Sequence, residues 1–204
     1  MDPGGQAKVS AMSYRLSFLL SAVFLVGLVG CGDGGDGPFD PFGGQPPTED
    51  LPARCVDVAA WGQAWVDFED QVLDLTNQRR AVATTCGNEG SFPGAPALTY
   101  NAHLRCAARM QSKDLAVRAF FDHVNPDGDG PDARITEAGY SWSTCGENIA
   151  AGQTTPEEVV DAWMNSPGHC ANIMHAAFAE LGVGYYFLAG SPYGHYWTQN
   201  FGHQ

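Results

Sequence analysis

The stretch that decides the fold is residues 145–150, Cys-Gly-Glu-Asn-Ile-Ala, which places a carboxylate and an amide just before an apolar pair. A second polar stretch, Ser-Pro-Gly-His-Cys, follows at residues 166–170. Between them, Thr155 offers an N-cap hydroxyl, with proline at the next position and Glu158 three residues after the cap. This capping box predicts a helix. The two polar stretches therefore flank one predicted helix.

Periodicity predicts the elements on either side of these stretches. Apolar residues at helical spacing indicate further helices, with glycine and proline turns between them, over residues 65–83, 104–119, 133–138 and 169–175. Alternating or aromatic-rich stretches indicate strands over residues 181–188 and 196–201. Helices packed in layers on a small antiparallel sheet are the expected α+β architecture.

Two of the six histidines stand out. His123 follows Phe-Phe-Asp at the exit of a predicted helix, and His169 lies at the entry of another. The remaining four fall at a helix start, in turns or at the C-terminus, where solvated or capping roles are expected; they are His103, His175, His195 and His203.

These segments together resemble the CAP superfamily of cysteine-rich secretory, antigen 5 and pathogenesis-related proteins, in its bacterial form. The resemblance covers about residues 68–202 and follows the order and spacing of the family. The matching stretches are residues 77–79, 121–128, 134–135, 138–140, 146–150, 162–164, 166–169, 181–185, 196–199 and 201–202. The resemblance implies a three-layer α-β-α sandwich with a small, mainly antiparallel central sheet.

The resemblance also implies a cleft, which two histidines and two glutamates line in eukaryotic members. The histidines carry over to His123 and His169, and one glutamate to Glu147. The second glutamate falls at Ser166, and Gln111 stands where many bacterial members are expected to have a histidine. Both departures weaken any metal site that relies on those positions.

Two interpretations of this site remain open. Two imidazoles and one carboxylate can bind Zn²⁺ or another divalent metal and leave a position for water. Alternatively, Glu147 and the histidines form a hydrogen-bond network under the cleft floor, with Asn148 bonding the backbone.

An enzymatic alternative is an esterase or protease, because Ser166, His169 and Glu147 supply the residue types of a hydrolase triad. However, no Gly-x-Ser-x-Gly elbow surrounds Ser166, and no His-Glu-x-x-His metalloprotease motif occurs. We therefore expect binding rather than strong catalysis. The divergent roles of the family, sterol and lipid binding among them, leave the ligand open among small molecules, lipids and proteins.

The N-terminus predicts export and anchoring. Residues 16–30 are uncharged, follow Arg15 and are too short to span a bilayer. They end in Leu-Val-Gly before Cys31, which resembles a bacterial lipoprotein cleavage box; an ordinary signal peptide cut nearby is the alternative. We expect a signal peptide over residues 1–30, a lipidated Cys31 with a Gly/Pro/Asp-rich linker over 31–54, and the CAP domain over 55–204.

Five cysteines follow Cys31, which in an exported protein predicts two disulfides and one leftover thiol. Spacing alone leaves their connectivity open. We predict Cys86–Cys106, which would pin the loop between two helices, and Cys145–Cys170, which would join the two polar stretches. Cys55, at the linker boundary, is then unpaired.

The net charge of -13 comes from 23 acidic and 10 basic residues, and no Lys or Arg follows Arg134. Because nucleic acids and anionic lipids are gripped by clustered cations, we expect neither as a partner. The sequence thus predicts a monomeric binding domain of the bacterial envelope or exterior, in contact with a membrane only through its lipid anchor.

Overall fold

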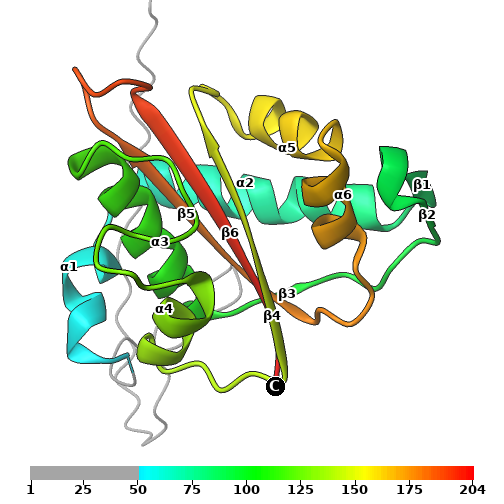
Figure 1. Cartoon of the computed structure of the whole chain (residues 1–204), viewed down its shortest axis with the longest axis horizontal. Coiled ribbons are helices and arrows are strands. Elements are labelled where there is room, and N and C mark those ends of the chain that lie inside the picture. The colour runs from blue at the N-terminus through cyan, green and yellow to red at the C-terminus, as the bar shows by residue number, and fades with distance from the viewer. Residues whose placement is uncertain (1–50) are drawn as a thin grey trace, which may run out of the picture. The chain divides into compact units, whose positions relative to one another are not determined.

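A computed structural model describes residues 51–204, which form three layers (Figure 1). The predicted signal peptide, Cys31 and residues 31–50 of the predicted linker lie outside the described residues. The α-helices of the described part are α1 (Val56–Ala59), α2 (Gln63–Arg80), α3 (Ala102–Val117), α4 (Pro131–Glu137), α5 (Pro156–Met164) and α6 (Pro167–Met174). Across residues 51–204, none of the helices has the length and apolar content needed to cross a bilayer.

The central sheet has the strand order β3-β5-β6-β4. Its strands are β3 (Thr99–Tyr100), β4 (Thr144–Ala151), β5 (Glu180–Phe187) and β6 (His195–His203). β6 runs antiparallel to both neighbours, and β3 pairs in parallel with only the first two residues of β5. A mainly antiparallel sheet is therefore confirmed. It has two open edges: β4, and the part of β5 that follows Leu181.

Helices cover both faces of this sheet. On one face α2, α5 and α6 pack around Trp163 and Trp197. On the other, α3 lies along β5 and β6, with α1 and α4 against it. The α-β-α sandwich expected from the sequence is thus present.

Two glycines let α3 approach β5 closely. A Cβ on Gly182 would lie 2.0 Å from the backbone nitrogen of Arg105, and one on Gly184 would lie 2.3 Å from the backbone of Ala108. Any side chain at either position would push the helix off the sheet. The Leu-Gly-Val-Gly-Tyr pattern of residues 181–185 therefore fixes the distance between these two layers.

The helix boundaries follow local capping. Asn101 caps α3, because its side chain accepts hydrogen bonds from the backbone of His103 and Leu104. Thr155 caps α5 as predicted, accepting from the backbone nitrogen of Glu158. In a complete capping box, the Glu158 carboxylate would also accept from the backbone nitrogen of Thr155. Here it accepts instead from the backbone nitrogen and the hydroxyl of Thr154.

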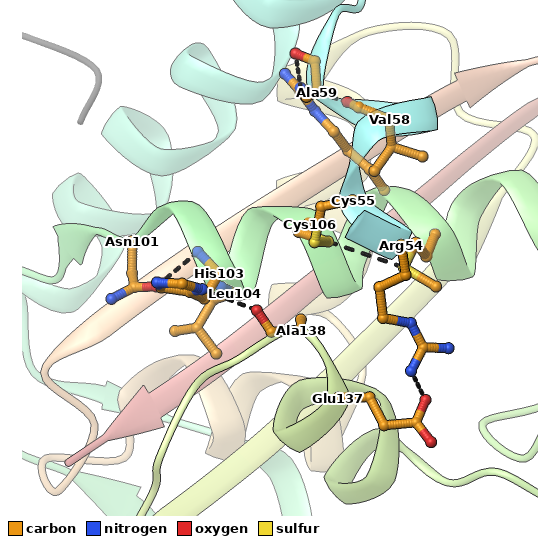
Figure 2. The surroundings of a disulfide bond; sticks show 12 residues. Arg54, Cys55, Val58, Ala59, Asn101, His103, Leu104, Cys106, Glu137 and Ala138 are labelled. Atoms are coloured by element: carbon orange, nitrogen blue, oxygen red, sulfur yellow. Dashed lines mark hydrogen bonds and ion pairs between the residues drawn. A yellow bond between two sulfur atoms is a disulfide. The ribbon is translucent and has the colours of Figure 1, made fainter. Parts of the chain in front are cut away.

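The expectation of two disulfides within the domain is confirmed, but the predicted pairing is wrong. The structure contains Cys55–Cys106, with Cα atoms 5.6 Å apart, and Cys86–Cys170, with Cα atoms 5.5 Å apart. Cys145 is the free thiol, so Cys55 is not the leftover cysteine. Figure 2 shows Cys55 joined to Cys106 on α3.

The position of each cysteine relative to the sheet explains why the observed disulfides differ from the predicted ones. Cys86 and Cys170 belong to the core cluster on the α2, α5 and α6 face of the sheet. Cys55 and Cys106 belong to a cluster on the α3 face, against which Cys145 also packs. Both predicted disulfides, Cys86–Cys106 and Cys145–Cys170, would have to pass through the sheet.

Candidate functional site

Glu147 is the centre of the candidate site. It lies on the edge strand β4, and its side chain is 1% exposed. Arg134 of α4 donates from Nη2 to both carboxylate oxygens, at 3.1 and 2.9 Å. Asn200, directly across the ladder on β6, donates to Oε2 at 3.0 Å when its amide is oriented to satisfy both of its neighbours. The carboxylate is therefore buried but fully hydrogen-bonded.

His123 connects this buried carboxylate to solvent. Its Nδ1 lies 2.9 Å from Oε1 of Glu147, and its side chain is 45% exposed. Because a carboxylate can only accept, Nδ1 carries the proton of this hydrogen bond. Nε2 is then the ring nitrogen left for another partner.

Hydrogen bonds of Gln111 and Asp122 hold the segment that carries His123 in place. Gln111, buried on α3, donates to the backbone oxygen of Asp122 at 2.9 Å. Asp122 in turn accepts from the backbone nitrogen of Val124 at 3.0 Å. His123 is thus positioned by its neighbours on both sides, and Gln111 supports the site from below rather than lining it.

His169 lies on the other side of the edge strand. It is half-buried in the first turn of α6, and its backbone oxygen accepts from Asn148 at 3.2 Å. Asn148 also donates to Gln199 at 3.0 Å and accepts from Asn172 at 3.0 Å. These amide contacts attach α6 to β4, as expected of an Asn148 that bonds the backbone.

The pleat of β4 separates the two histidines. Ile149 belongs to a core cluster with Leu115 of α3, whereas Ala150 belongs to the cluster around α5 and α6. Since side chains alternate along a strand, Glu147 shares the face of Ile149, and Asn148 shares that of Ala150. His123 and His169 therefore approach β4 from opposite faces.

The two imidazoles have opposite pKa shifts. The hydrogen bond with Glu147 raises the pKa of His123 above its ordinary value. Burial lowers the pKa of His169, and the nearby charge of His123 lowers it further. At pH values near 6.5, the site consequently favours a protonated His123 beside a neutral His169.

The side chains as placed do not form a three-ligand metal site. Within residues 51–204, no three His, Cys, Asp or Glu side chains gather closely enough to hold an ion. Arg134, His123 and Asn200 already occupy the Glu147 oxygens, and a metal would have to displace one of them. Glu147 and His123 form part of the hydrogen-bond network of the alternative interpretation, whereas His169 takes part only through its backbone oxygen.

Ser166 does not contact His169 in the way a hydrolase requires. It is the N-cap residue of α6, and in the described part of the chain its side chain makes no capping hydrogen bond and none to an imidazole. A serine nucleophile needs a base within hydrogen-bonding reach. Ser166, His169 and Glu147 thus do not form the hydrogen-bonded triad that the hydrolase alternative requires.

Arg134 and Asn200 are hydrogen-bond partners of Glu147 that the sequence did not single out. Both are buried, at 3% and 0% exposure, Arg134 beside the buried Ile135 of α4 and Asn200 among the buried residues of β6. A buried arginine must be paired, so an arginine on the apolar face of a short helix is a signal that a carboxylate lies nearby.

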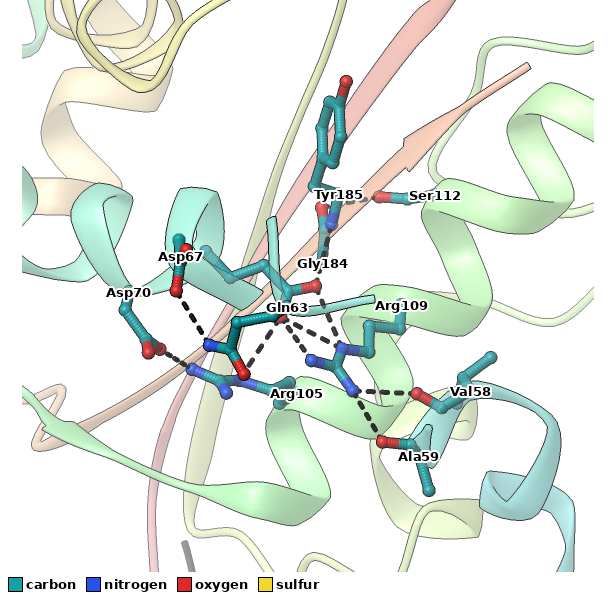
Figure 3. Close-up of polar contacts among 11 residues, drawn as sticks. Val58, Ala59, Gln63, Asp67, Asp70, Arg105, Arg109, Ser112, Gly184 and Tyr185 are labelled. Atoms are coloured by element: carbon teal, nitrogen blue, oxygen red, sulfur yellow. Dashed lines mark hydrogen bonds and ion pairs between the residues drawn. The ribbon is translucent and has the colours of Figure 1, made fainter. Parts of the chain in front are cut away.

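A second buried carboxylate, Glu69 of α2, lies at the opposite edge of the sheet. Figure 3 labels three of its neighbours, Arg105, Arg109 and Tyr185. Arg109 of α3 donates to it from Nε and Nη2, at distances between 2.5 and 3.0 Å. The backbone nitrogen of Tyr185, on the open part of β5, donates to its Oε1 at 3.1 Å. Nε of Arg105 lies 3.7 Å from Oε2 of Glu69, and Nη2 of Arg105 forms an ion pair with Asp70. This cluster joins α2 to α3 around the sheet edge.

Comparison with known proteins places this chain in a family. Residues 73–201 match the CAP family, described as the cysteine-rich secretory protein family. The uncharacterized protein YkwD of Bacillus subtilis is 40% identical over 134 residues, which is 66% of this chain and 46% of that protein. The uncharacterized membrane protein YlbC of the same organism is 28% identical over 148 residues, or 72% of this chain and 38% of that protein.

A solved structure agrees with this match. The crystal structure of an extracellular protein containing an SCP domain, from Bacillus anthracis, superposes with a TM-score of 0.57 at 27% identity. The match covers 70% of this chain and 42% of that one. This chain thus spans less than half the length of each of these three relatives.

Proposed function

This chain belongs to the cysteine-rich secretory protein (CAP) family, and we propose that it is an exported binding domain whose ligand contacts His123. The observation that carries the proposal is the hydrogen bond from the half-exposed His123 to the buried Glu147. A fixed, partly charged imidazole at the surface is a suitable anchor for an acidic or polar group.

The surroundings of His123 suggest the rest of the ligand. Phe121 and Val124 flank it in sequence and are 45% and 49% exposed. The ring of Phe121 lies 5.9 Å from that of Tyr193, which is also exposed. Large apolar side chains grouped at a surface commonly mark a binding site. We therefore propose a small amphiphilic anion, with its acidic group on Nε2 of His123 and its apolar part on Phe121 and Tyr193.

Octanoate is the probe that tests this proposal, with octyl glucoside as the neutral-headed comparison. Near pH 6.5, we expect octanoate to bind the purified chain, measured by calorimetry, and to shift the imidazole resonances of His123 by NMR. Because a charge-assisted hydrogen bond is lost, His123→Gln is expected to weaken octanoate binding about tenfold.

His175→Gln is the matched control, because His175 is exposed at the end of α6 and contacts Phe178 rather than the site. It is expected to leave octanoate affinity unchanged. Equal binding of octyl glucoside, or undiminished octanoate binding by His123→Gln, would contradict the proposal.

We also propose that the domain is tethered outside the cytoplasm through Cys31, as a monomer that does not bind nucleic acid. Two disulfides suit an oxidising compartment, and the Bacillus anthracis relative is described as extracellular. Mass spectrometry of the protein from its host is expected to find Cys31 as an acylated N-terminus. An unmodified N-terminus elsewhere would contradict the anchor and leave the binding proposal intact.

A further inference from the structure

A pocket with a volume of about 340 Å³ lies apart from His123 and His169. Arg54, Asp57 and Val58 near the N-terminus form one wall, and the 125–129 loop and Arg134 form another. One face of α3 lies between these walls, with Met110, Lys113, Asp114, Val117 and Arg118 lining the pocket. Figure 2 shows Arg54 and Val58 next to α3. This volume is at the lower end of small-molecule sites, so a compact ligand fits.

Lys113 is the unusual residue of this pocket. Of the lysine and arginine side chains in residues 51–204, it alone has neither a carboxylate within 4.0 Å nor a hydrogen bond to a backbone oxygen. The pocket's other cations are occupied: Arg54 pairs with Glu137, Arg118 with Asp127, and Arg134 with Glu147. Lys113 is half-buried, and its ammonium is free to bind a carboxylate.

Two carboxylates of the pocket are also available. Asp57, on α1, has no ion-pair or side-chain hydrogen-bond partner among the described residues. Asp114 is half-buried and has only a long contact to Arg118, at 3.5 Å. The pocket therefore offers a positive charge on α3, from Lys113, and negative charges on α3 and α1, from Asp114 and Asp57. The apolar side chains of Val58, Met110 and Val117 line the same pocket.

We propose that this pocket binds a small zwitterion, a free amino acid or dipeptide with an aliphatic side chain. Its carboxylate binds Lys113, its ammonium binds Asp57 and Asp114, and its side chain packs on Met110 and Val117. A simple anion would face the carboxylates of Asp57 and Asp114, and a simple cation would face Lys113. The pocket therefore selects a ligand that carries both charges.

The proposal does not depend on the function proposed for His123. Arg134 separates the two sites: its Nη1 donates to the backbone oxygen of Asp129 on the pocket side, and its Nη2 donates to Glu147. Lys113 and Asp57 make no contact with His123, so the two proposals are tested by different variants.

Leucine is the probe, and its two half-molecules are the comparisons: 4-methylpentanoate, which lacks the ammonium, and 3-methylbutylamine, which lacks the carboxylate. Calorimetry on the full chain near pH 7 is expected to show leucine or a leucine-containing dipeptide binding about tenfold more tightly than either half-molecule. Lys113→Met, which keeps the length of the side chain, is expected to weaken leucine binding about tenfold. Asp57→Asn is expected to weaken leucine but not 4-methylpentanoate.

Arg79→Met is the matched control, since it also removes one positive charge but lies on α2, where Arg79 pairs with the exposed Asp161. It is expected to leave leucine affinity unchanged. Three results would overturn the proposal: no binding of leucine or the dipeptide at millimolar concentration, equal affinity for leucine and 4-methylpentanoate, or undiminished binding by Lys113→Met.

Discussion

Glu69 and Glu147 are equally buried, at 0% and 1% side-chain exposure, but they lie at opposite edges of the sheet and differ in what covers them. Each accepts two or more hydrogen bonds from an arginine. At the β5 edge, every other partner of Glu69 is itself buried. At the β4 edge, one partner of Glu147 is the half-exposed, titratable His123. The same carboxylate–arginine pair is thus enclosed at one edge and open to solvent at the other.

The N-terminal segment produces this difference. Nη1 of Arg109 donates to the backbone oxygens of Val58 and Ala59 (Figure 3). The Arg109 guanidinium also lies 5.0 Å from the ring centre of Trp61. The Cys55–Cys106 disulfide holds this segment against α3. No comparable segment within residues 51–204 covers His123. The enclosed edge therefore stabilises the fold, whereas the open edge is available for binding.

The largest expected effect is at the enclosed edge. Glu69→Gln leaves Arg109 and Arg105 buried without their shared carboxylate, and removal of one partner from a buried ion pair costs about 3–5 kcal/mol. Urea denaturation is expected to show this loss in the free energy of unfolding. Asp161→Asn, which breaks an exposed pair with Arg79, is the control and is expected to cost less than about 1 kcal/mol. Similar losses for both variants would contradict an enclosed, structural role for Glu69.

The covering segment itself provides the next test. Replacing both Cys55 and Cys106 with serine removes a disulfide that links positions 51 residues apart. Loss of such a native disulfide lowers the free energy of unfolding by about 2–4 kcal/mol. We expect this loss in urea denaturation, together with faster proteolysis near α1. Cys145→Ser is the control, because Cys145 is the free thiol and its replacement breaks no disulfide. Peptide mapping that found Cys145 in a disulfide would contradict the pairing on which this test rests.

Several elements of the fold could be predicted from the sequence because their signals are local, but the edge strand β4 was not among the predicted strands. The capped helix that begins after Thr155 and the strands around Leu181 and Tyr196 are set by neighbouring residues, and they lie within a few residues of their predicted bounds. Glu147 and both histidines could be singled out because a family resemblance supplied them. These predictions did not depend on contacts between residues that are distant in sequence.

The layers themselves were predicted, but the rest depended on which face of the sheet each residue lies on, which the sequence does not specify. The disulfides link cysteines 51 and 84 positions apart, and their pairing follows from the face of the sheet on which each cysteine lies. Similarly, Glu147 and His169 both belong to the expected site, but the pleat of β4 directs Glu147 away from the α6 layer. A list of site residues therefore did not reveal that Arg134 and Asn200 donate hydrogen bonds to the carboxylate of Glu147.

A smaller loss of stability is expected at the open edge. Glu147→Gln leaves Arg134 without a charged partner, at a cost of about 1–3 kcal/mol, because the exposed His123 gives water a route to the vacated contacts. Urea denaturation alongside Glu69→Gln measures the difference directly. Glu157→Gln, an exposed change on α5, is the control. Equal losses for Glu69→Gln and Glu147→Gln would show that the β4 edge is as enclosed as the β5 edge.

The smallest effect is the pH dependence, and here the two histidines of the open edge oppose each other. The folded pKa of His123 is raised, so its contribution to stability is fully present below its unfolded pKa of about 6.5 and is lost as pH rises through the folded pKa. The folded pKa of His169 is lowered, so the fold loses stability as pH falls below about 6.5 and His169 protonates more readily when unfolded. Between about pH 8 and 5.5, His169→Gln is expected to become more stable relative to wild type as pH falls, and His123→Gln less stable. Paired urea denaturation measures both trends.

NMR titration then assigns the cause, because Glu147→Gln removes the hydrogen bond that raises the pKa of His123 and is expected to lower that pKa. If the pKa of His123 were unchanged in Glu147→Gln, the buried carboxylate would not control the exposed imidazole, and the contrast between the two edges would be one of packing alone.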